Sequence, residues 1–479
     1  PDRGMPGTSC VNLLGGVAGP NVYEVEHAHD GFQRMELLQS ALFLDYEFDA
    51  ASLTVILAHQ VNERQTFNET DGAPQGVLTA HFDDEHEQVS LEARLSSNGD
   101  GPWNWVVGGF YYDDRLEYFR SNYILAFGGT SAGRYNEIDA TNSAIFGEVS
   151  YDLTDRLSAT AGLRITRDER VGAIVAGSIV PNPTLGSTYL GRDTWFGFPN
   201  NTIVSSLRNQ SNDWTEPSAR ISLLYAATDD VNLWFTWSRS FRGGDFNGGA
   251  LEEDEFVVTD PEFLSNFEFG FKGDFLENTL RLNASIFYYD YTDKIGFVEI
   301  PGARGPLGSI SLLANFGDVE GQGGEVEFDW QATDNFNISS NLAYTDAEFV
   351  TTNFGLGFGG GDITGNKPAK TPELAWNTFL TYTNDLANGG ELRFMVNPHW
   401  QDDQFFTDVN RNYEAQEAFW LLHASVAYTS PDDTWSVRVW GKNLGDEEWL
   451  ADGFTFIAEH LAIPGGQPRQ FGATVSYRF

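Results

Sequence analysis

Two groups of aromatic residues have the side chains best suited to bind a small ligand, and one of the groups also contains an arginine. Aromatic faces pack against flat rings, and a guanidinium beside them adds an attraction for charge. Ordinary loop packing or an interfacial aromatic girdle is the competing explanation for both groups. The first group is Tyr189, Trp195, Phe196 and Phe198, and the second is Phe405, Phe406, Arg411 and Tyr413.

Charged and imidazole side chains offer a second kind of chemistry. Arg242 ends an alternating run, where it can contact a ligand or pair with loop acids. His27 and His29 stand beside Asp30, but a metal clasp needs a further converging ligand. The acidic run 252–255 is either a Ca²⁺ or Mg²⁺ site or a solvated loop. We expect neither a metal site nor a bound cofactor.

Signatures of catalysis are missing. The sequence holds no HExxH, no GxSxG and no P-loop, and the glycine-rich stretch 355–362 precedes no helical pattern. Its one cysteine, Cys10, excludes a disulfide framework and a cysteine metal cluster. A net charge of -41 excludes a protein that grips nucleic acid through phosphates. The protein is therefore not expected to be an enzyme.

The elements that carry these residues alternate with period two. In the last segment one face carries the apolar set Phe471, Ala473, Val475, Tyr477 and Phe479, and the residues that alternate with them are small or polar. The segment 157–165 repeats the pattern, with Arg164 on its polar side. Further alternating runs lie at 89–95, 217–225, 280–288, 324–330 and 422–428. Strands of roughly ten residues or more are long enough to cross a bilayer when tilted.

Short polar segments alternate with long ones between these strands. The short segments are 48–52, 96–102, 153–156, 227–232, 274–279, 332–337, 384–390 and 430–434. Each lies between two alternating runs, as a hairpin turn does. The longest of the other connections covers about 167–213. Tight turns at one end of a sheet and large loops at the other are typical of outer-membrane barrels.

The predicted fold is all-β, a transmembrane antiparallel β-barrel of about 17 strands. No run of 18 apolar residues exists, so no helix is expected to span a bilayer. A propeller fits worse, because each interval holds two long strands and not four short ones. An odd strand count is unusual for a bacterial barrel, and it makes the first strand, about 35–48, run parallel to the last, 470–479. We expect an open edge between these two strands.

From about residue 213 to its end the sequence resembles the barrel of TonB-dependent outer-membrane receptors. The likeness is carried by DVNLWFTWSRSFRGGDFNGG (230–249), PEFLSNFEFGFKGDFLENTLRLNASIFYYDYTDK (261–294), NFGDVEGQGGEVEFDWQATDNFNISSNLAYTDAEF (315–349), and VWGKNLGDEEW (439–449) with PGGQPRQFGATVSYRF (464–479). Residues 36–115 are a looser counterpart of earlier strands. These four motifs follow the family's order over more than half of the chain, so together they indicate this family specifically.

The resemblance implies the C-terminal portion of a 22-stranded barrel around a plugged lumen. About five strands, the plug and the energy-coupling box would then lie outside this sequence. Residues 1–34 would be the remnant of an extracellular loop, and residues 35–479 the incomplete barrel. The implied function is active uptake of a scarce nutrient, by default a ferric siderophore, energised through TonB at the outer membrane of a Gram-negative bacterium.

Alternatives to this function stay open. Haem, cobalamin and oligosaccharide are possible substrates within the family. A passive porin, which would show a loop folded into an open channel, and a structural or adhesive barrel are different kinds of protein. The implied partners are TonB through the N-terminal region, a small iron complex, outer-membrane lipid and lipopolysaccharide. The barrel assembly machinery would engage the terminal Phe479. If the acidic run 252–255 binds a Ca²⁺ or Mg²⁺ ion, it would do so at the lipopolysaccharide surface.

Polar residues on the predicted inner face have two interpretations. They form either a solvated ladder of wall charges that docks a plug or a route for the substrate. His399 and His423 are expected on this face of neighbouring strands, with hydrogen bonding favoured over metal binding. The inner charges are Glu268, Lys272, Arg281, Glu325, Glu327 and Asp329.

Overall fold

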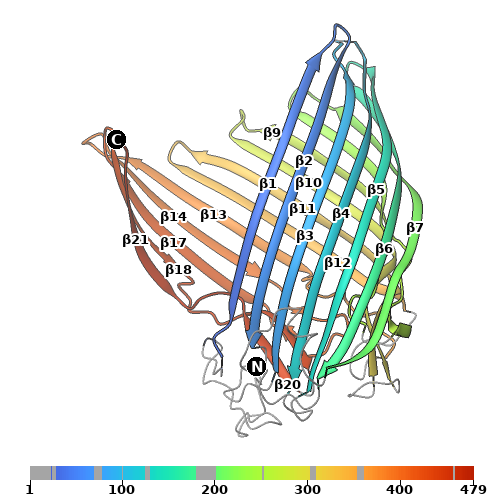
Figure 1. Ribbon diagram of the computed structural model, residues 1–479. Helices are drawn as coiled ribbons and strands as arrows, with labels where there is room; N and C mark the ends of the chain where they lie inside the picture. Colours follow the sequence, from blue (N-terminus) through green and yellow to red (C-terminus); the bar gives the residue numbers. More distant parts are fainter. Residues whose placement is uncertain are drawn as a thin grey trace.

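One large curved wall of antiparallel strands makes up most of the protein (Figure 1). The computed structural model describes Tyr23 and residues 29–69, 78–99, 101–124, 130–179, 201–250, 253–301, 309–352, 361–456 and 459–479. Within these residues one sheet contains 17 strands, and two further pairs of short strands lie outside it. The prediction of an all-β barrel wall of about 17 strands is confirmed. No described helix is long and apolar enough to cross a membrane.

Each strand of the wall pairs with the next one along the chain, and the two small strand pairs are inserted between neighbours. β14 therefore pairs with β17, and β18 with β21. The wall strands are β1 (Phe32–Glu47), β2 (Ala51–Glu69), β3 (Leu78–Ser97), β4 (Trp103–Ile124), β5 (Thr130–Thr154), β6 (Leu157–Ile179), β7 (Asn201–Ala226), β8 (Val231–Arg242), β9 (Glu262–Phe275), β10 (Leu280–Pro301), β11 (Ser309–Thr333), β12 (Phe336–Thr352), β13 (Leu374–Asp385), β14 (Glu391–Gln401), β17 (Phe419–Thr429), β18 (Trp435–Lys442) and β21 (Gln470–Tyr477). The inserted elements are β15 (Gln404–Phe405), β16 (Ala415–Gln416), β19 (Leu450–Phe456), β20 (Glu459–Pro464) and the short helix η3 (Glu253–Glu255).

The predicted short segments are all turns between paired strands, and they gather at one end of the wall, the upper end in Figure 1. We call this the turn end and the opposite one the loop end. Small polar residues close the turns. At 430–434, for example, the hydroxyls of Ser430 and Thr434 donate to the Asp432 carboxylate and hold the pKa of that carboxyl below its usual range. The predicted asymmetry of short turns and long connections is confirmed.

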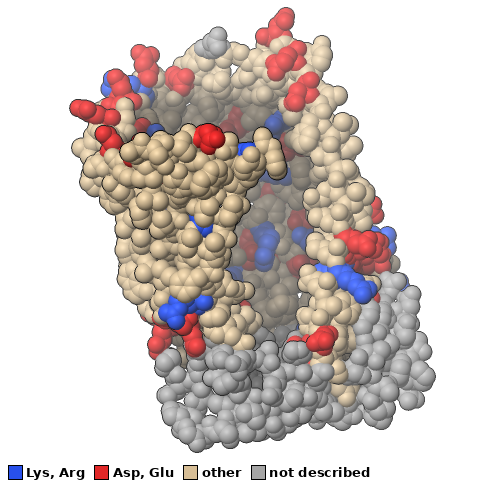
Figure 2. Space-filling view, turned by 90° about the vertical axis from the view of Figure 1, so that its left-hand side faces the viewer, with Lys and Arg blue, Asp and Glu red and all other residues tan. Residues whose placement is uncertain are grey.

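The wall has two free edges. In the described residues β1 pairs only with β2, and β21 pairs only with β18. Both edge strands finish at the turn end, so they run in the same direction and cannot join an antiparallel ladder. The expected open edge is therefore confirmed. Figure 2 looks through this gap at acidic and basic side chains on the inside of the wall.

The register assigns each strand residue to the outer or the inner face, because directly opposed residues share a face. Exposed apolar side chains cover the outer face, such as Ile286 at 63% and Val475 at 71% exposure. Arg164 lies on the inner face, as predicted, and stacks over Phe110. The predicted inner charges also lie there, namely Glu268, Lys272, Arg281, Glu325, Glu327 and Asp329.

The extent predicted for the longest loop, 167–213, is wrong. β6 continues to Ile179 and β7 begins at Asn201. Beyond the apolar band the outward positions are charged, and Arg167 pairs with Glu169 at 3.2 Å and with Asp213 at 3.4 Å. Around Arg167–Arg170 both faces carry charge, and beyond Arg170 the strand has apolar and small residues on both faces, with Ile174 buried on the inner one, so the alternation disappears from the sequence although backbone pairing continues.

Candidate functional site

Two connections at the loop end are bonded into one unit. We call residues 361–373 and 402–418 the loop pair. The Asn410 side chain accepts a hydrogen bond from Lys367 N and donates one to Lys367 O, both at 2.8 Å. The Asp408 carboxylate accepts from Ala369 N at 2.8 Å, and Asn366 donates to Asp408 O at 2.9 Å. These bonds hold the two loops in one fixed arrangement.

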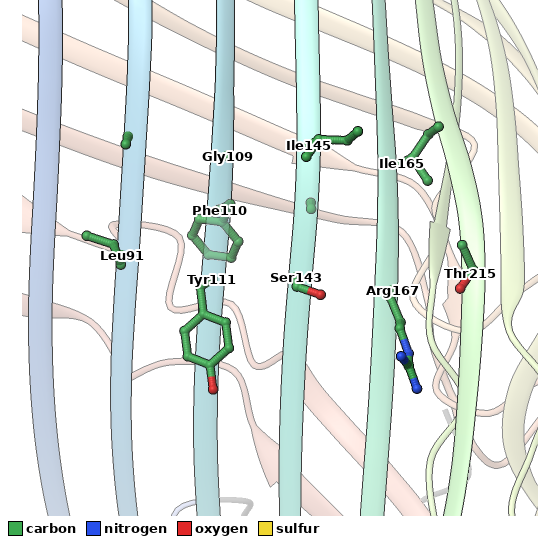
Figure 3. A pocket seen from close by; sticks show the side chains of 11 residues that line it. Leu91, Gly109, Phe110, Tyr111, Ser143, Ile145, Ile165, Arg167 and Thr215 are labelled. Atoms are coloured by element: carbon green, nitrogen blue, oxygen red, sulfur yellow. The ribbon is translucent and has the colours of Figure 1, made fainter.

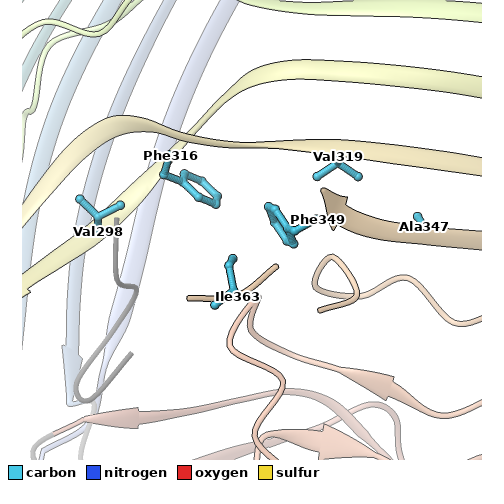
Figure 4. Packing of buried hydrophobic residues seen from close by; sticks show 6 residues of the cluster. All are labelled: Val298, Phe316, Val319, Ala347, Phe349 and Ile363. Carbon is cyan, nitrogen blue, oxygen red and sulfur yellow. The ribbon is translucent and has the colours of Figure 1, made fainter. Parts of the chain in front are cut away.

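A buried apolar cluster anchors the loop pair to the wall. It consists of Val298, Phe316, Val319, Ala347, Phe349 and Ile363, which come from β10, β11, β12 and the first loop (Figure 4). Lys294 crosses from β10 to the second loop, where its ammonium lies 3.3 Å from Asp408. The same ammonium is 4.7 Å from the ring centre of Phe316, so it is held by a carboxylate and an aromatic face together.

The second predicted aromatic group lies in this loop pair. Phe405 belongs to β15, and Phe406 is only 5% exposed, so Phe406 packs inside the loop. Arg411 is mostly buried, 3.5 Å from Glu414, and lies 6.0 Å from the ring of Tyr413. Tyr413 itself is 57% exposed. The structure thus brings Arg411 and Tyr413 together as predicted and leaves Tyr413 as the accessible aromatic face.

Arg242 lies beside the same part of β10. Its guanidinium is 2.6 Å from Glu262, a residue of β9 that is 4% exposed. The other oxygen of Glu262 accepts a hydrogen bond from Ile295 N at 2.7 Å, one residue beyond Lys294. Among the residues that the structure describes, Arg242 therefore pairs with a wall acid and with no loop acid. The first aromatic group, Tyr189, Trp195, Phe196 and Phe198, lies outside the described residues.

Residues 246–250 and 253–258, which we call the inner arm, lie against the inside of the wall. Phe246 stacks on Phe256 with ring centres 5.1 Å apart and packs against Ile138 and Ile174. Gly172 makes room for it, since a Cβ there would lie 2.8 Å from Phe246. We did not predict this arm. Its glycine and aromatic residues are typical of a loop, but they do not indicate that the segment folds onto the inside of the wall.

The inner arm corrects our view of the acidic run 252–255. Glu255 lies in η3 and is 9% exposed, so the solvated-loop interpretation is wrong at this residue. The physical reason is that folding of the arm onto the wall removes water from it. In the described residues no group of three or more His, Cys, Asp or Glu could hold a metal ion.

Of the histidines singled out from the sequence, His423 forms a hydrogen bond through its ring. His399 and His423 lie on the inner face of neighbouring strands, as predicted. His423 Nδ1 accepts from Asn443 N at 3.0 Å. His29 uses its backbone N–H to donate to Glu69 at 2.7 Å, while His27 lies outside the described residues.

A hollow of about 500 Å³ lies on the outer face of the wall across β3 to β7 (Figure 3). Its floor is formed by small side chains such as Ala93 and Gly109, between Leu91, Ile145 and Ile165. These are outward positions of the apolar band, so the hollow faces lipid and not the inside of the barrel. It is not a candidate for nutrient binding.

Comparison with known proteins gives the family. Residues 13–444 match the family model described as TonB dependent receptor-like, beta-barrel. A probable TonB-dependent siderophore receptor, PiuA of Acinetobacter baumannii, is 27% identical over 171 residues, which are 33% of this chain and 21% of that protein. The pesticin receptor of Yersinia enterocolitica is 24% identical over 281 residues, 58% of this chain and 36% of the receptor. The chain thus matches well under half the length of these relatives.

Solved structures show the same fold. The ferric yersiniabactin uptake receptor FyuA from Yersinia pestis superposes with a TM-score of 0.74 at 17% identity, over 93% of this chain and 62% of that one. The siderophore receptor PiuA from Acinetobacter baumannii gives a TM-score of 0.68 at 16% identity, over 94% and 65%. Together with the family match and the open wall of long strands, these findings establish that the chain belongs to the TonB-dependent receptor β-barrel family.

Proposed function

We propose that the protein takes up a scarce nutrient, with a ferric siderophore as its substrate, across the outer membrane of a Gram-negative bacterium in a process energised by TonB. Its outer face suits lipid, its inner face is charged, and its family consists of transport receptors and not of enzymes. The observation that carries the proposal is that a wall with an apolar outer face and a charged inner face matches the TonB-dependent receptor family. In this proposal residues 35–479 are the barrel portion.

The substrate class is supported by what the related proteins are named for. These include a probable siderophore receptor, a metal-pseudopaline receptor of Pseudomonas aeruginosa and a ferric yersiniabactin receptor. A copper transporter, OprC, has the same fold with a TM-score of 0.68 at 16% identity. The shared chemistry of these ligands is a metal, free or held in a small complex, and we propose such a complex for this protein.

We assign ligand contacts to the loop end. Arg411 and Tyr413 are presented by the rigid loop pair, with Phe405 and Phe406 behind them and Arg242 on the adjoining wall. The group Tyr189, Trp195, Phe196 and Phe198 is proposed as a second contact region. Trp195→Ala should weaken ligand binding without unfolding the barrel. Unchanged affinity would remove that loop from the site.

Further partners follow from the same proposal. The apolar outer band meets membrane lipid, and the charged outward ends of the strands at the loop end meet lipopolysaccharide. Tyr477 and Phe479 lie edge to face at the exposed C-terminus, ring centres 5.5 Å apart. We propose that this aromatic end is what the barrel assembly machinery engages.

One observation favours passive diffusion as a second candidate. A porin would carry a loop folded into its channel, and the inner arm does lie inside the wall. The arm is bonded flat against the strands, however, with Tyr118 Oη donating to Gly248 O at 2.8 Å. An arm held in this way lines the wall and does not by itself set a pore diameter.

Uptake of labelled ferric siderophore into cells that express the protein tests the two candidates. Cells with and without a functional TonB are compared, and the collapse of the proton gradient provides a second control. We expect accumulation against the gradient only where TonB is present. Accumulation that is equal in both strains would contradict active uptake and support the porin.

A further inference from the structure

The hollow on the outer face lies where the apolar band of the wall ends (Figure 3). The register of β3 to β7 sets three successive outward rows across this region, each about 7 Å nearer the loop end than the row before. The first row contributes to the hollow Ala93, Gly109, Ile145 and Ile165. The second row contributes Leu91, Tyr111, Ser143, Arg167 and Thr215. The third row, just beyond the hollow, holds Val89, Asp113, Thr141, Glu169 and Asp213. The hollow therefore has an apolar end and a charged end.

A missing side chain creates part of this space, although the packing of the wall does not require it to be missing. Apart from its chain neighbours, a Cβ added to Gly109 would meet only Ala144 O within 4 Å, at 3.7 Å, which is ordinary contact. The preceding Gly108 on the inner face differs, because a Cβ there would lie 2.5 Å from the Phe146 ring. A glycine inside a strand weakens the strand and often marks a place where a ligand approaches closely. Gly109 fits this description, since a larger side chain could be accommodated at its position.

Three carboxylates at the charged end, those of Asp113, Glu169 and Asp213, are called the acidic rim. Arg167 lies among them, 3.2 Å from Glu169 and 3.4 Å from Asp213. These side chains are half-exposed, so a headgroup at the membrane surface can reach them. The single guanidinium does not neutralise the carboxylates around it, which leaves the rim negative. A headgroup that fits must bring positive charge for the carboxylates and an acceptor for the guanidinium, because a phosphate alone would meet net repulsion.

We propose that the hollow binds one molecule of lipopolysaccharide whose lipid A phosphate carries an aminoalkyl group. An acyl chain fills the apolar end, Arg167 donates paired hydrogen bonds to the phosphate oxygens, and the acidic rim holds the ammonium. Tyr111 lies at the border between the two ends, where the amphipathic ring of a tyrosine suits the membrane surface. The lipid comes from the outer leaflet, because the charged end of the hollow lies towards the loop end. This inference rests on the proposed outer-membrane location and concerns a lipid partner, not the nutrient.

Native mass spectrometry of the full-length protein in detergent tests the site with lipid A substituted with phosphoethanolamine, unsubstituted lipid A and phosphatidylethanolamine. We expect the wild type to bind the substituted lipid A about tenfold more tightly than the unsubstituted form. Gly109→Leu fills the hollow and should weaken binding of the substituted form by about tenfold, whereas Ala284→Leu on the outer face of β10 should not. The double variant Glu169→Gln with Asp213→Asn should lose the preference for the substituted form. Asp290→Asn, which removes an outward acid of β10, should keep it.

Thermal stability separates a lipid site from a structural defect. Without lipid, Gly109→Leu should melt at the wild-type temperature or above it, since leucine suits a strand better than glycine. Substituted lipid A should raise the melting temperature of the wild type and not that of Gly109→Leu. Equal affinity of the wild type for both forms of lipid A, or unchanged affinity in Gly109→Leu, would overturn the site. Tighter binding of phosphatidylethanolamine than of either lipid A would overturn the proposed source of the lipid. Lipid preference without ferric siderophore uptake by the wild type would support the lipid site and contradict only the proposed function.

Discussion

Asn410 should control the rigidity of the loop pair. Its side chain makes three hydrogen bonds, two with Lys367 at 2.8 Å and one with Thr407 O at 3.2 Å, and its backbone has a positive φ of 56°. Asn410→Ala removes all three bonds and places an alanine in a conformation that asparagine tolerates better. The change alters neither the barrel wall nor the apolar cluster.

The magnitude follows from these contacts. Each lost hydrogen bond is worth about 1 kcal/mol net, and the left-handed backbone adds roughly another 1 kcal/mol. Water can replace part of the lost bonding at this partly exposed position, which leaves about 2 kcal/mol for opening of the loop pair. That value corresponds to roughly 30-fold faster local opening.

Hydrogen exchange measured by mass spectrometry reads this opening directly, because the amides of Lys367 and Ala369 are donors in the affected bonds. Asn388→Ala in the turn 386–390 is the matched control, since it removes an asparagine bond to Gly390 N at the other end of the wall. Exchange at 367 and 369 that is the same in Asn410→Ala and in the control would refute the idea that the two loops form one unit.

Three further predictions concern the wall and its loops. Gly270→Val should destabilise the barrel by roughly 1–3 kcal/mol, because a Cβ there would lie 2.5 Å from Trp234, whereas Gly445→Ala, with nothing within 4 Å, should be neutral in the same denaturation assay. Ile286→Lys on the outer face should cost about 2–4 kcal/mol in lipid vesicles, and a cost no larger than that of its inner-face neighbour Ser285→Lys would argue against the assigned register. The Thr364 hydroxyl, the Thr364 N–H and the Thr352 hydroxyl donate to the Asp362 carboxylate and lower its pKa to about 2, so these hydrogen bonds are fully present above the ordinary pKa of 3.8 and are lost only as the pH falls through about 2. Hydrogen exchange at Thr364, corrected for the intrinsic rate, should therefore not change between pH 7 and pH 4, and faster exchange near pH 4 would contradict the assignment.

Sequence reasoning was accurate where one face of a strand meets lipid. Period-two alternation placed Arg164 and Glu327 on the inner face and Val475 on the outer one, because a shift by one residue would expose charge to hydrocarbon. The turns were predicted for a related reason, since each interrupts the alternation with small polar residues. The open edge followed from the direction of the first and last strands.

The same reasoning failed where a strand does not turn one apolar and one polar face to its surroundings. The paired ends of β6 and β7 lack a regular alternation, because charges occur on both faces around Arg167–Arg170 and apolar residues such as the buried Ile174 occur on the inner face beyond them, so no period marks them as strand. The inner arm depends on contacts between Phe246 and residues more than 70 positions away, which local patterns do not encode. For this reason the burial of Glu255 and the joining of the loop pair emerged only from the structure.

Labelling of neighbouring residues on β11 tests the two-faced wall most directly. Val326 faces outward and Glu327 inward, one residue apart and both exposed. In a Cys10→Ser background, Val326→Cys and Glu327→Cys are reconstituted in lipid vesicles and treated with a charged, water-soluble maleimide. We predict rapid labelling at 327 and protection at 326. Equal labelling of both cysteines, or protection at 327 alone, would contradict a wall that turns one face to hydrocarbon and the other to water.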